Sequence, residues 1–149
     1  MKLLITGGAG YVGARLARTL LARGSLDGRA ITRIVIADQA PAPADLLADA
    51  RVEGRVGKLL AHCQGLRDEA FDGVFHLASA VSGECEADFE LGLHSNLDST
   101  RALLDALRHR ADQGGTPTKL VFSSSVAVFG PDPAVPFAGI VADDTLPTP

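Results

Sequence analysis

Residues 2–13 read KLLITGGAGYVG, an apolar run that leads into three glycines at the spacing G-x-x-G-x-x-G. The run 2–6 predicts a buried strand, because its residues are mostly large and apolar. At Gly7, Gly10 and Gly13 the backbone has no Cβ, so it can come close to a pyrophosphate. A strand that passes through such a turn into a helix is typical of a dinucleotide site.

The segment after the glycines predicts a helix over residues 11–23. Val12, Leu16 and Leu20 fall on one helical face, and Gly24 is a natural stop. The first N–H groups of a helix lack partners and the dipole is positive there, so this end favours a phosphate. The contacts expected from the loop are Gly7, Gly10, Tyr11, Val12 and Gly13.

A second apolar strand over 33–37 ends in Asp38. A carboxylate at this point accepts hydrogen bonds from ribose hydroxyls and repels a 2′-phosphate. Asp38 therefore predicts NAD rather than NADP as the cofactor. The alternative is an ordinary cap at the end of a strand.

The rest of the chain alternates between strands and helices. Further strands are expected over 51–57, 72–78 and 118–123. Helical segments are expected over 45–50, 58–70 and 86–111, the last with Leu93, Leu97, Leu104 and Leu107 at helical spacing. This alternation predicts an α/β fold with a doubly wound, Rossmann-like parallel sheet in the strand order 3-2-1-4-5. The ligand crevice is then expected at the carboxyl ends of strands 1 and 4.

Composition excludes several other classes of protein. A length of 149 residues suits one domain, and a net charge of −4 gives no electrostatic reason to expect nucleic acid. No apolar run approaches the roughly 20 residues that cross a bilayer, so no membrane partner is expected. Cys63 and Cys85 form no metal or disulfide pattern. We expect both to be packing residues of a protein in the reducing cytoplasm. No metal site is expected.

Four motifs resemble the extended short-chain dehydrogenase/reductase family of NAD-dependent epimerases and dehydratases. They are TGGAGYVG at 6–13, HLAS at 76–79, NLDST at 96–100 and SSSVAVFG at 123–130. Their order and spacing cover essentially the whole chain. Residues 80–92 followed by NLDSTRALLDAL further resemble members that oxidise a four-carbon sugar acid with NAD.

The resemblance implies roles for residues outside the glycine loop. Leu77, Ala78 and Ser79 are expected to touch the dinucleotide, and Ser123 to lie near it. Ser125 is expected to be catalytic, with its hydroxyl donating to the substrate oxygen as hydride moves to NAD. Asn96 has two readings of equal weight, a brace beside the nicotinamide half or a polar residue on a helix surface. His76 is expected to be a packed core histidine.

The family's acid/base pair, Tyr-x-x-x-Lys, is absent. Tyr11 is the single tyrosine, and Arg15 stands four residues after it. We therefore expect residues 1–130 to be an incomplete NAD-binding domain. We expect 131–149 to be a proline-rich loop leading to a missing C-terminal part, with the sixth strand and the substrate lobe.

Three functions remain open at this point. The first is the cofactor half of an NAD-dependent dehydrogenase of a sugar acid, which is inactive as the chain stands. The second is a stand-alone NAD-binding sensor or interaction module. The third is a fragment of a nucleotide-sugar epimerase or dehydratase. The uncovered strand 5 predicts a tendency to self-associate, a homodimer included.

Overall fold

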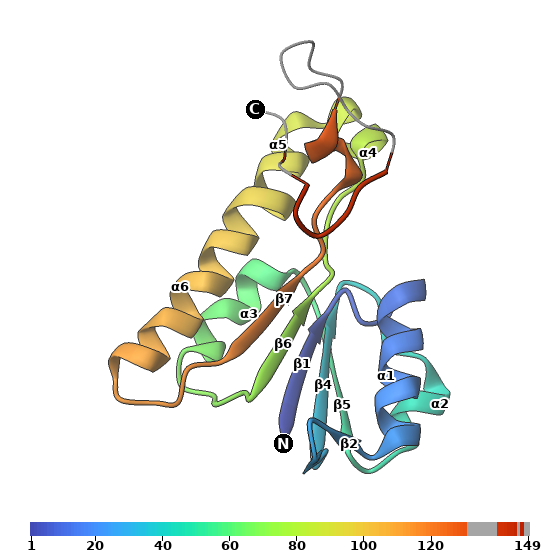
Figure 1. Cartoon of the computed structure of the whole chain (residues 1–149), viewed down its shortest axis with the longest axis vertical. Coiled ribbons are helices and arrows are strands. Elements are labelled where there is room, and N and C mark those ends of the chain that lie inside the picture. The colour runs from blue at the N-terminus through green and yellow to red at the C-terminus, as the bar shows by residue number, and fades with distance from the viewer. Residues whose placement is uncertain (131–139, 146, 148–149) are drawn as a thin grey trace.

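The computed structural model describes residues 1–130, 140–145 and 147, and its centre is a five-stranded sheet (Figure 1). The sheet has the order β5-β4-β1-β6-β7, and every neighbouring pair is parallel. Its strands are β1 (Lys2–Thr6), β4 (Arg33–Asp38), β5 (Val52–Val56), β6 (Gly73–His76) and β7 (Lys119–Phe122). The predicted order 3-2-1-4-5 is confirmed.

Helices cover both faces of the sheet (Figure 1). α1 (Tyr11–Arg23) and α2 (Ala44–Leu47) lie on one face, and α3 (Leu59–Leu66) and α6 (Ser99–Asp112) lie on the other (Figure 1). The short helices α4 (Ser82–Ala87) and α5 (Phe89–Gly92) lie beyond the carboxyl ends of the strands (Figure 1). Alternate residues of β1 point to opposite faces, as in any strand. Leu3 and Ile5 enter the core under α1 and α2, whereas Leu4 enters the core under α3 and α6.

The predicted helix over 11–23 has the observed bounds, but its predicted apolar face was partly wrong. Val12 is 63% exposed, and the buried positions are Gly13, Ala14, Ala17 and Leu20. Small residues occupy the buried face because α1 lies close against the glycine loop. Val12 stands in the first turn of α1.

The single helix predicted over 86–111 is instead broken into several pieces. Asp88 leaves the helical region with φ −141° and caps α5 by accepting from the Leu91 N–H at 3.0 Å. A π-helical turn, η1 (Leu93–Asp98), then precedes α6. The wider π turn shifts the helical register, so Leu97 and Leu104 are exposed and the buried face of α6 is Ser99, Leu103 and Ala106.

Two short elements were not predicted. A hairpin of β2 (Ser25–Leu26) and β3 (Arg29–Ala30) turns at Asp27 and Gly28, which have φ of 53° and 72°. Asp-Gly is a favoured pair for such a two-residue turn, so the signal was in the sequence. After β7, a 3₁₀ turn, η2 (Val126–Phe129), follows the serines.

The predicted proline-rich loop lies largely outside the described residues, which omit 131–139, 146, 148 and 149. Within the described part, a turn forms between Ala142 and Thr145. The Thr145 N–H donates to the Ala142 carbonyl at 3.0 Å, and the Thr145 hydroxyl accepts from the Ala142 N–H at 2.8 Å.

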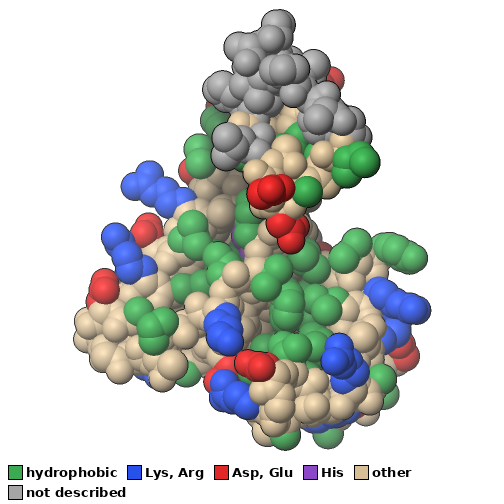
Figure 2. Space-filling view, in the orientation of Figure 1, with side chains coloured by type: hydrophobic (Ala, Val, Ile, Leu, Met, Phe, Trp, Pro, Cys, Tyr) green, Lys and Arg blue, Asp and Glu red, His purple; other side chains and the backbone are tan. Residues whose placement is uncertain are grey.

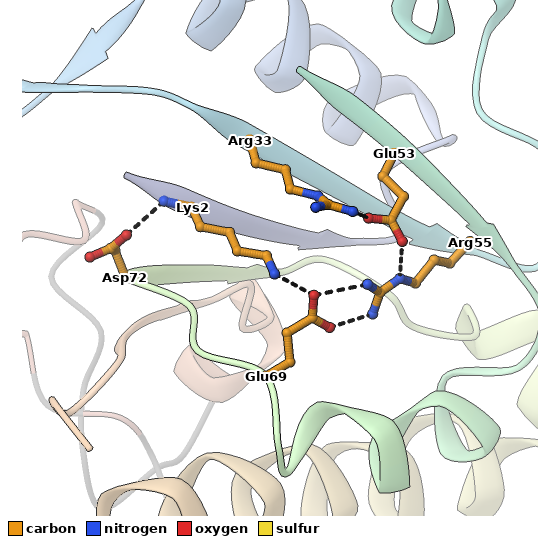
Figure 3. A network of polar contacts seen from close by, with 6 residues as sticks. All are labelled: Lys2, Arg33, Glu53, Arg55, Glu69 and Asp72. Atoms are coloured by element: carbon orange, nitrogen blue, oxygen red, sulfur yellow. Dashed lines mark hydrogen bonds and ion pairs between the residues drawn. The ribbon is translucent and has the colours of Figure 1, made fainter. Parts of the chain in front are cut away.

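A network of charged side chains covers the sheet beside α3 (Figure 3). Arg55 donates to both carboxylate oxygens of Glu69, at 2.7 and 2.9 Å, and to Glu53 at 2.7 Å. Lys2 also pairs with Glu69, and Arg33 pairs with Glu53. Because Arg55 and Lys2 stabilise the charged form, the pKa of Glu69 falls from its usual value to about 2.

Hydrophobic side chains gather on one face of the molecule over the strands between α1 and α6 (Figure 2). On β7, Val121 is 53% exposed and Phe122 is 55% exposed. In the described part of the chain, β7 pairs with β6 alone and forms an edge of the sheet. The sheet therefore presents an apolar edge at this end.

Candidate functional site

The main crevice lies at the carboxyl ends of the strands, where the sequence placed it. It has a volume of about 730 Å³. Six of the predicted cofactor residues line it, namely Gly7, Gly10, Asp38, Leu77, Ala78 and Ser79. These residues follow β1, β4 and β6, which are neighbours in the sheet although they are far apart in the sequence.

The glycine loop is packed too tightly for side chains. Gly7 has φ +69°, and a Cβ there would lie 2.7 Å from the backbone nitrogen of Ala78. A Cβ on Gly13 would lie 2.4 Å from the Gly7 carbonyl oxygen and 2.6 Å from the Gly8 Cα. The loop, the start of α1 and the chain after β6 thus meet backbone to backbone.

The N-terminus of α1 offers donors at this point. The first hydrogen bond of the helix is donated by the Ala14 N–H to the Gly10 carbonyl at 2.9 Å. The amides of Tyr11, Val12 and Gly13 precede it, as the first amides of any helix do. The first turn carries no acidic side chain. This end of α1 is therefore suited to an anion. The Tyr11 side chain itself is 91% exposed.

Asp38 ties two loops to the end of β4. One carboxylate oxygen accepts from the Ala9 N–H at 2.9 Å, and the other accepts from the Ala40 N–H at 3.1 Å. The Asp38 carbonyl also accepts from the Gly57 N–H at 2.8 Å. Each carboxylate oxygen keeps a second lone pair, which a ribose hydroxyl could use from the crevice.

The chain after β6 is held from two sides. The Ala78 N–H donates to the Thr6 hydroxyl at 3.3 Å. Asn96 accepts from the Ala80 N–H at 2.8 Å and donates to the Ala80 carbonyl at 3.0 Å. Asn96 therefore braces the loop, which was one of its two readings. It is not among the residues that line the crevice, so its contact with a cofactor stays a prediction.

The predicted serines lie at the end of β7, outside the lining of the crevice. Ser123 donates from its hydroxyl to the His76 carbonyl at 3.2 Å. Ser125 precedes η2, and its hydroxyl accepts from the Ala127 N–H at 3.1 Å. The catalytic role of Ser125 and the cofactor role of Ser123 stay predictions. His76 is 1% exposed, so its prediction as a core residue is confirmed.

Several lining residues were not identified from the sequence. Gln39 follows Asp38, and Gly57, Lys58 and Leu60 follow β5. The rule that ligands meet the carboxyl ends of parallel strands could have found them, because β5 is the neighbour of β4. The opposite wall comes from the segment that runs from α4 to the first residue of α6, with Glu84, Asp88, Glu90, Leu91, His94, Ser95 and Ser99.

Most of the charged side chains that line the crevice are acidic. Its charged lining residues in the described chain are Asp38, Lys58, Glu84, Asp88 and Glu90, so Lys58 is the one lysine or arginine among them. A dinucleotide pyrophosphate would therefore depend on backbone N–H groups rather than on a basic side chain. This dependence fits the tight, Cβ-free loop at Gly7 and Gly13.

The described residues offer neither a metal site nor a membrane-spanning helix. They contain no group of three or more His, Cys, Asp and Glu side chains that could hold a metal ion. They also contain no helix long and apolar enough to cross a membrane.

Comparisons with known proteins agree with this geometry. The sequence profile of the NAD dependent epimerase/dehydratase family matches residues 3–149. D-erythronate dehydrogenase from Cupriavidus necator is 44% identical over 156 aligned positions, which take in 100% of this chain and 45% of that enzyme.

Two solved structures have the same fold. The nucleoside-diphosphate-sugar epimerase from Agrobacterium tumefaciens has a TM-score of 0.83 and 36% identity, over 100% of this chain and 43% of that protein. The UDP-glucose 4-epimerase from Thermus thermophilus, solved in complex with NAD, has a TM-score of 0.72 and 28% identity, over 100% of this chain and 45% of that protein. This chain thus spans less than half the length of all three proteins.

Proposed function

Because this chain belongs to the NAD dependent epimerase/dehydratase family, we propose that it forms the cofactor-binding half of an NAD-dependent dehydrogenase. Its substrate is a sugar acid resembling D-erythronate, of which one hydroxyl is oxidised to give a keto acid. The observation that carries the proposal is the crevice that brings Gly7, Asp38 and Ala78 together at the carboxyl ends of β1, β4 and β6. The choice of sugar acid rests on the 44% identity to D-erythronate dehydrogenase.

The residues of the crevice fit NAD. A Cβ at Gly7 or Gly13 would clash with the backbone of Ala78 or of the loop itself, so the glycines let these segments pack closely at the place where a pyrophosphate would meet the loop. The early amides of α1 donate to the phosphate oxygens, and Asp38 accepts from the adenosine ribose. When NAD is bound, its nicotinamide ring supplies the hydride acceptor.

The residues of this chain position the cofactor and the substrate, but they do not supply the proton acceptor. In the proposal, Ser125 donates to the substrate oxygen, and the Ala78 loop and Ser123 lie along the dinucleotide. Tyr11 is the single tyrosine and has no lysine four residues later. We therefore assign the proton acceptor to sequence outside this chain and expect negligible dehydrogenase activity from the 149 residues alone.

Residues 1–130 form the cofactor-binding domain, and 131–149 lead to the substrate lobe. Cys63 and Cys85 are both free, which is consistent with a reducing compartment such as the cytoplasm.

Two other functions remain as alternatives. The likeness to the Agrobacterium tumefaciens sugar epimerase favours a fragment of a nucleotide-sugar epimerase or dehydratase. The missing Tyr-x-x-x-Lys pair favours a stand-alone NAD-binding sensor or interaction module.

One experiment separates the three. The gene is sequenced past codon 149, any longer product is purified, and its NADH production is followed with a panel of aldonates and nucleotide sugars. We expect turnover with D-erythronate or a close isomer. Turnover or epimerisation of nucleotide sugars alone would replace the substrate. A stop codon directly after residue 149, together with tight NAD binding, would favour the sensor.

A further inference from the structure

A buried chain of polar groups runs from the cofactor loop into the core. Its members are the Ala78 N–H, the Thr6 hydroxyl, the His76 imidazole and the Thr100 hydroxyl. The Ala78 N–H donates to Thr6 Oγ1 at 3.3 Å, Thr6 Oγ1 lies 2.6 Å from His76 Nδ1, and His76 Nε2 lies 2.9 Å from Thr100 Oγ1. Thr6 is fully buried and His76 is 1% exposed. Water therefore cannot readily replace a missing partner at Thr6 or His76, whereas Ala78 and Thr100, at the two ends, are half-buried.

The donors and acceptors can be ordered from one end. Thr6 Oγ1 already accepts from the Ala78 N–H, so its single hydrogen is available to donate. The ring nitrogen beside it, His76 Nδ1, accepts that hydrogen only when it carries no proton. The neutral imidazole then has its proton on Nε2 and donates it to Thr100. In this order every hydrogen between Ala78 and Thr100 has an acceptor.

The surroundings of His76 favour the neutral ring. Within the described part of the chain, the His76 ring bonds to Thr6 of β1 and Thr100 of α6 and lies against the Phe122 ring of β7, and none of these side chains is charged. Burial without a carboxylate partner lowers the pKa of His76 below its usual value.

We propose that His76 is a positioning residue of the cofactor crevice. By accepting from Thr6, the imidazole turns the hydroxyl so that its oxygen holds the Ala78 backbone against the glycine loop. A shift of Ala78 would disturb the cofactor crevice directly, because Ala78 packs against the glycine loop. A Cβ on Gly7 would lie only 2.7 Å from the Ala78 nitrogen. This inference deepens the proposed function and rests on it for the role of the crevice.

Protonation of His76 reverses the direction of its hydrogen bond with Thr6. A proton from solvent on Nδ1 makes that nitrogen a donor, so the Thr6 oxygen must accept from both His76 and Ala78. The Thr6 hydrogen is then left without its acceptor in a buried place, which is costly. The hydroxyl can relieve that cost only by turning toward another acceptor, which takes its oxygen away from the Ala78 N–H. The Ala78 contact therefore weakens as the pH falls through the pKa of His76, and NAD affinity falls with it.

The first test needs no cofactor. In the 149-residue chain labelled with ¹⁵N, the imidazole shifts of His76 report its tautomer, and hydrogen exchange of the Ala78 amide reports the contact. We expect the Nε2–H tautomer at neutral pH. We also expect the Ala78 protection factor to fall about tenfold as His76 becomes protonated. A proton on Nδ1 at neutral pH, or Ala78 protection that ignores the titration, would overturn the proposal.

The second test uses variants and NAD. Thr6→Val removes the hydroxyl at nearly constant shape, and we expect an NAD Kd about tenfold higher with no further rise on acidification. Thr6→Ser keeps the hydroxyl, so its NAD Kd should vary with pH as that of the wild type does. His109→Asn, an exposed change on α6, is the matched control and should leave it unchanged. An acid-dependent Kd that persists in Thr6→Val would overturn the proposal. Absence of NAD binding at every pH would instead refute the proposed function, while the Ala78 measurement would still decide the role of His76.

Discussion

Replacing Gly13 by alanine has two opposite effects on stability. Helix propensity favours alanine, whereas the close packing around Gly13 disfavours it. Gly13 lies in the first turn of α1 and is buried. Alanine is favoured over glycine inside a helix by up to about 1 kcal/mol. The new Cβ, however, would lie 2.4 Å from the Gly7 oxygen and 2.6 Å from the Gly8 Cα.

The clash should outweigh the gain. Both contacts are with backbone, which cannot turn aside as a flexible side chain can, so α1 or the loop must shift. Added volume in a packed core costs about 1–3 kcal/mol and sometimes more. Allowing for the propensity gain, we expect Gly13→Ala to lower the free energy of unfolding by about 1–2 kcal/mol. The shift also moves the amides of α1, so the NAD Kd should rise at least about tenfold.

Gly65→Ala provides a matched control, because the same substitution then meets open space. Gly65 lies in α3, and a Cβ there would have no neighbour within 4 Å. We expect it to be neutral or to stabilise by up to about 1 kcal/mol, with an unchanged NAD Kd. Urea unfolding and isothermal titration calorimetry measure both quantities. If Gly13→Ala matched Gly65→Ala in both, the tight loop would not be what holds the pyrophosphate.

Three further changes test other parts of the account. Asp38→Ala should weaken NAD binding and reduce the preference over NADP, and unchanged affinities for both cofactors would refute the ribose contact. Glu69 is held ionised by Arg55 and Lys2, so its stabilisation is complete above its usual pKa of 4.5 and is lost as the pH falls towards about 2. Glu69→Gln should cost about 1–2 kcal/mol at pH 7 and flatten that acid limb in urea unfolding, whereas an identical pH profile would contradict the network. Val121→Lys should abolish self-association through β7 in sedimentation velocity, and a wild-type chain that is monomeric at all concentrations would remove that surface from consideration.

The order of the sheet could be predicted because its signals are local. Every strand except β5 is a short, mainly apolar run, and right-handed crossovers constrain how the strands can be ordered. Gly7, Gly10 and Asp38 could be placed in the crevice for the same reason, since Gly7 and Asp38 directly follow predicted strands and Gly10 lies in the turn after the first of them. The Asp-Gly pair at Asp27 and Gly28 carried an equally local signal that was missed.

The far wall of the crevice could not be predicted from local pattern. The leucines of 86–111 keep a helical spacing, but Asp88 breaks the helix by capping the next one, and the π turn at Leu93–Asp98 shifts the register. The cap is a local bond to the Leu91 N–H that the spacing of the leucines does not reveal, and Cys85 lies against Gly92, where an added Cβ would come within 3.0 Å of the Cys85 side chain. The position of Lys58 was missed because the strand before it, with Gly54 inside it, is only weakly apolar.

Binding of NAD to the 149-residue chain tests the central claim most directly. Isothermal titration calorimetry with NAD, with NADP as the comparison, measures whether the crevice at Gly7, Asp38 and Ala78 holds the dinucleotide. We predict saturable binding of one NAD per chain that is at least about tenfold tighter than binding of NADP. A folded chain that binds neither cofactor, or binds NADP more tightly, would contradict the account.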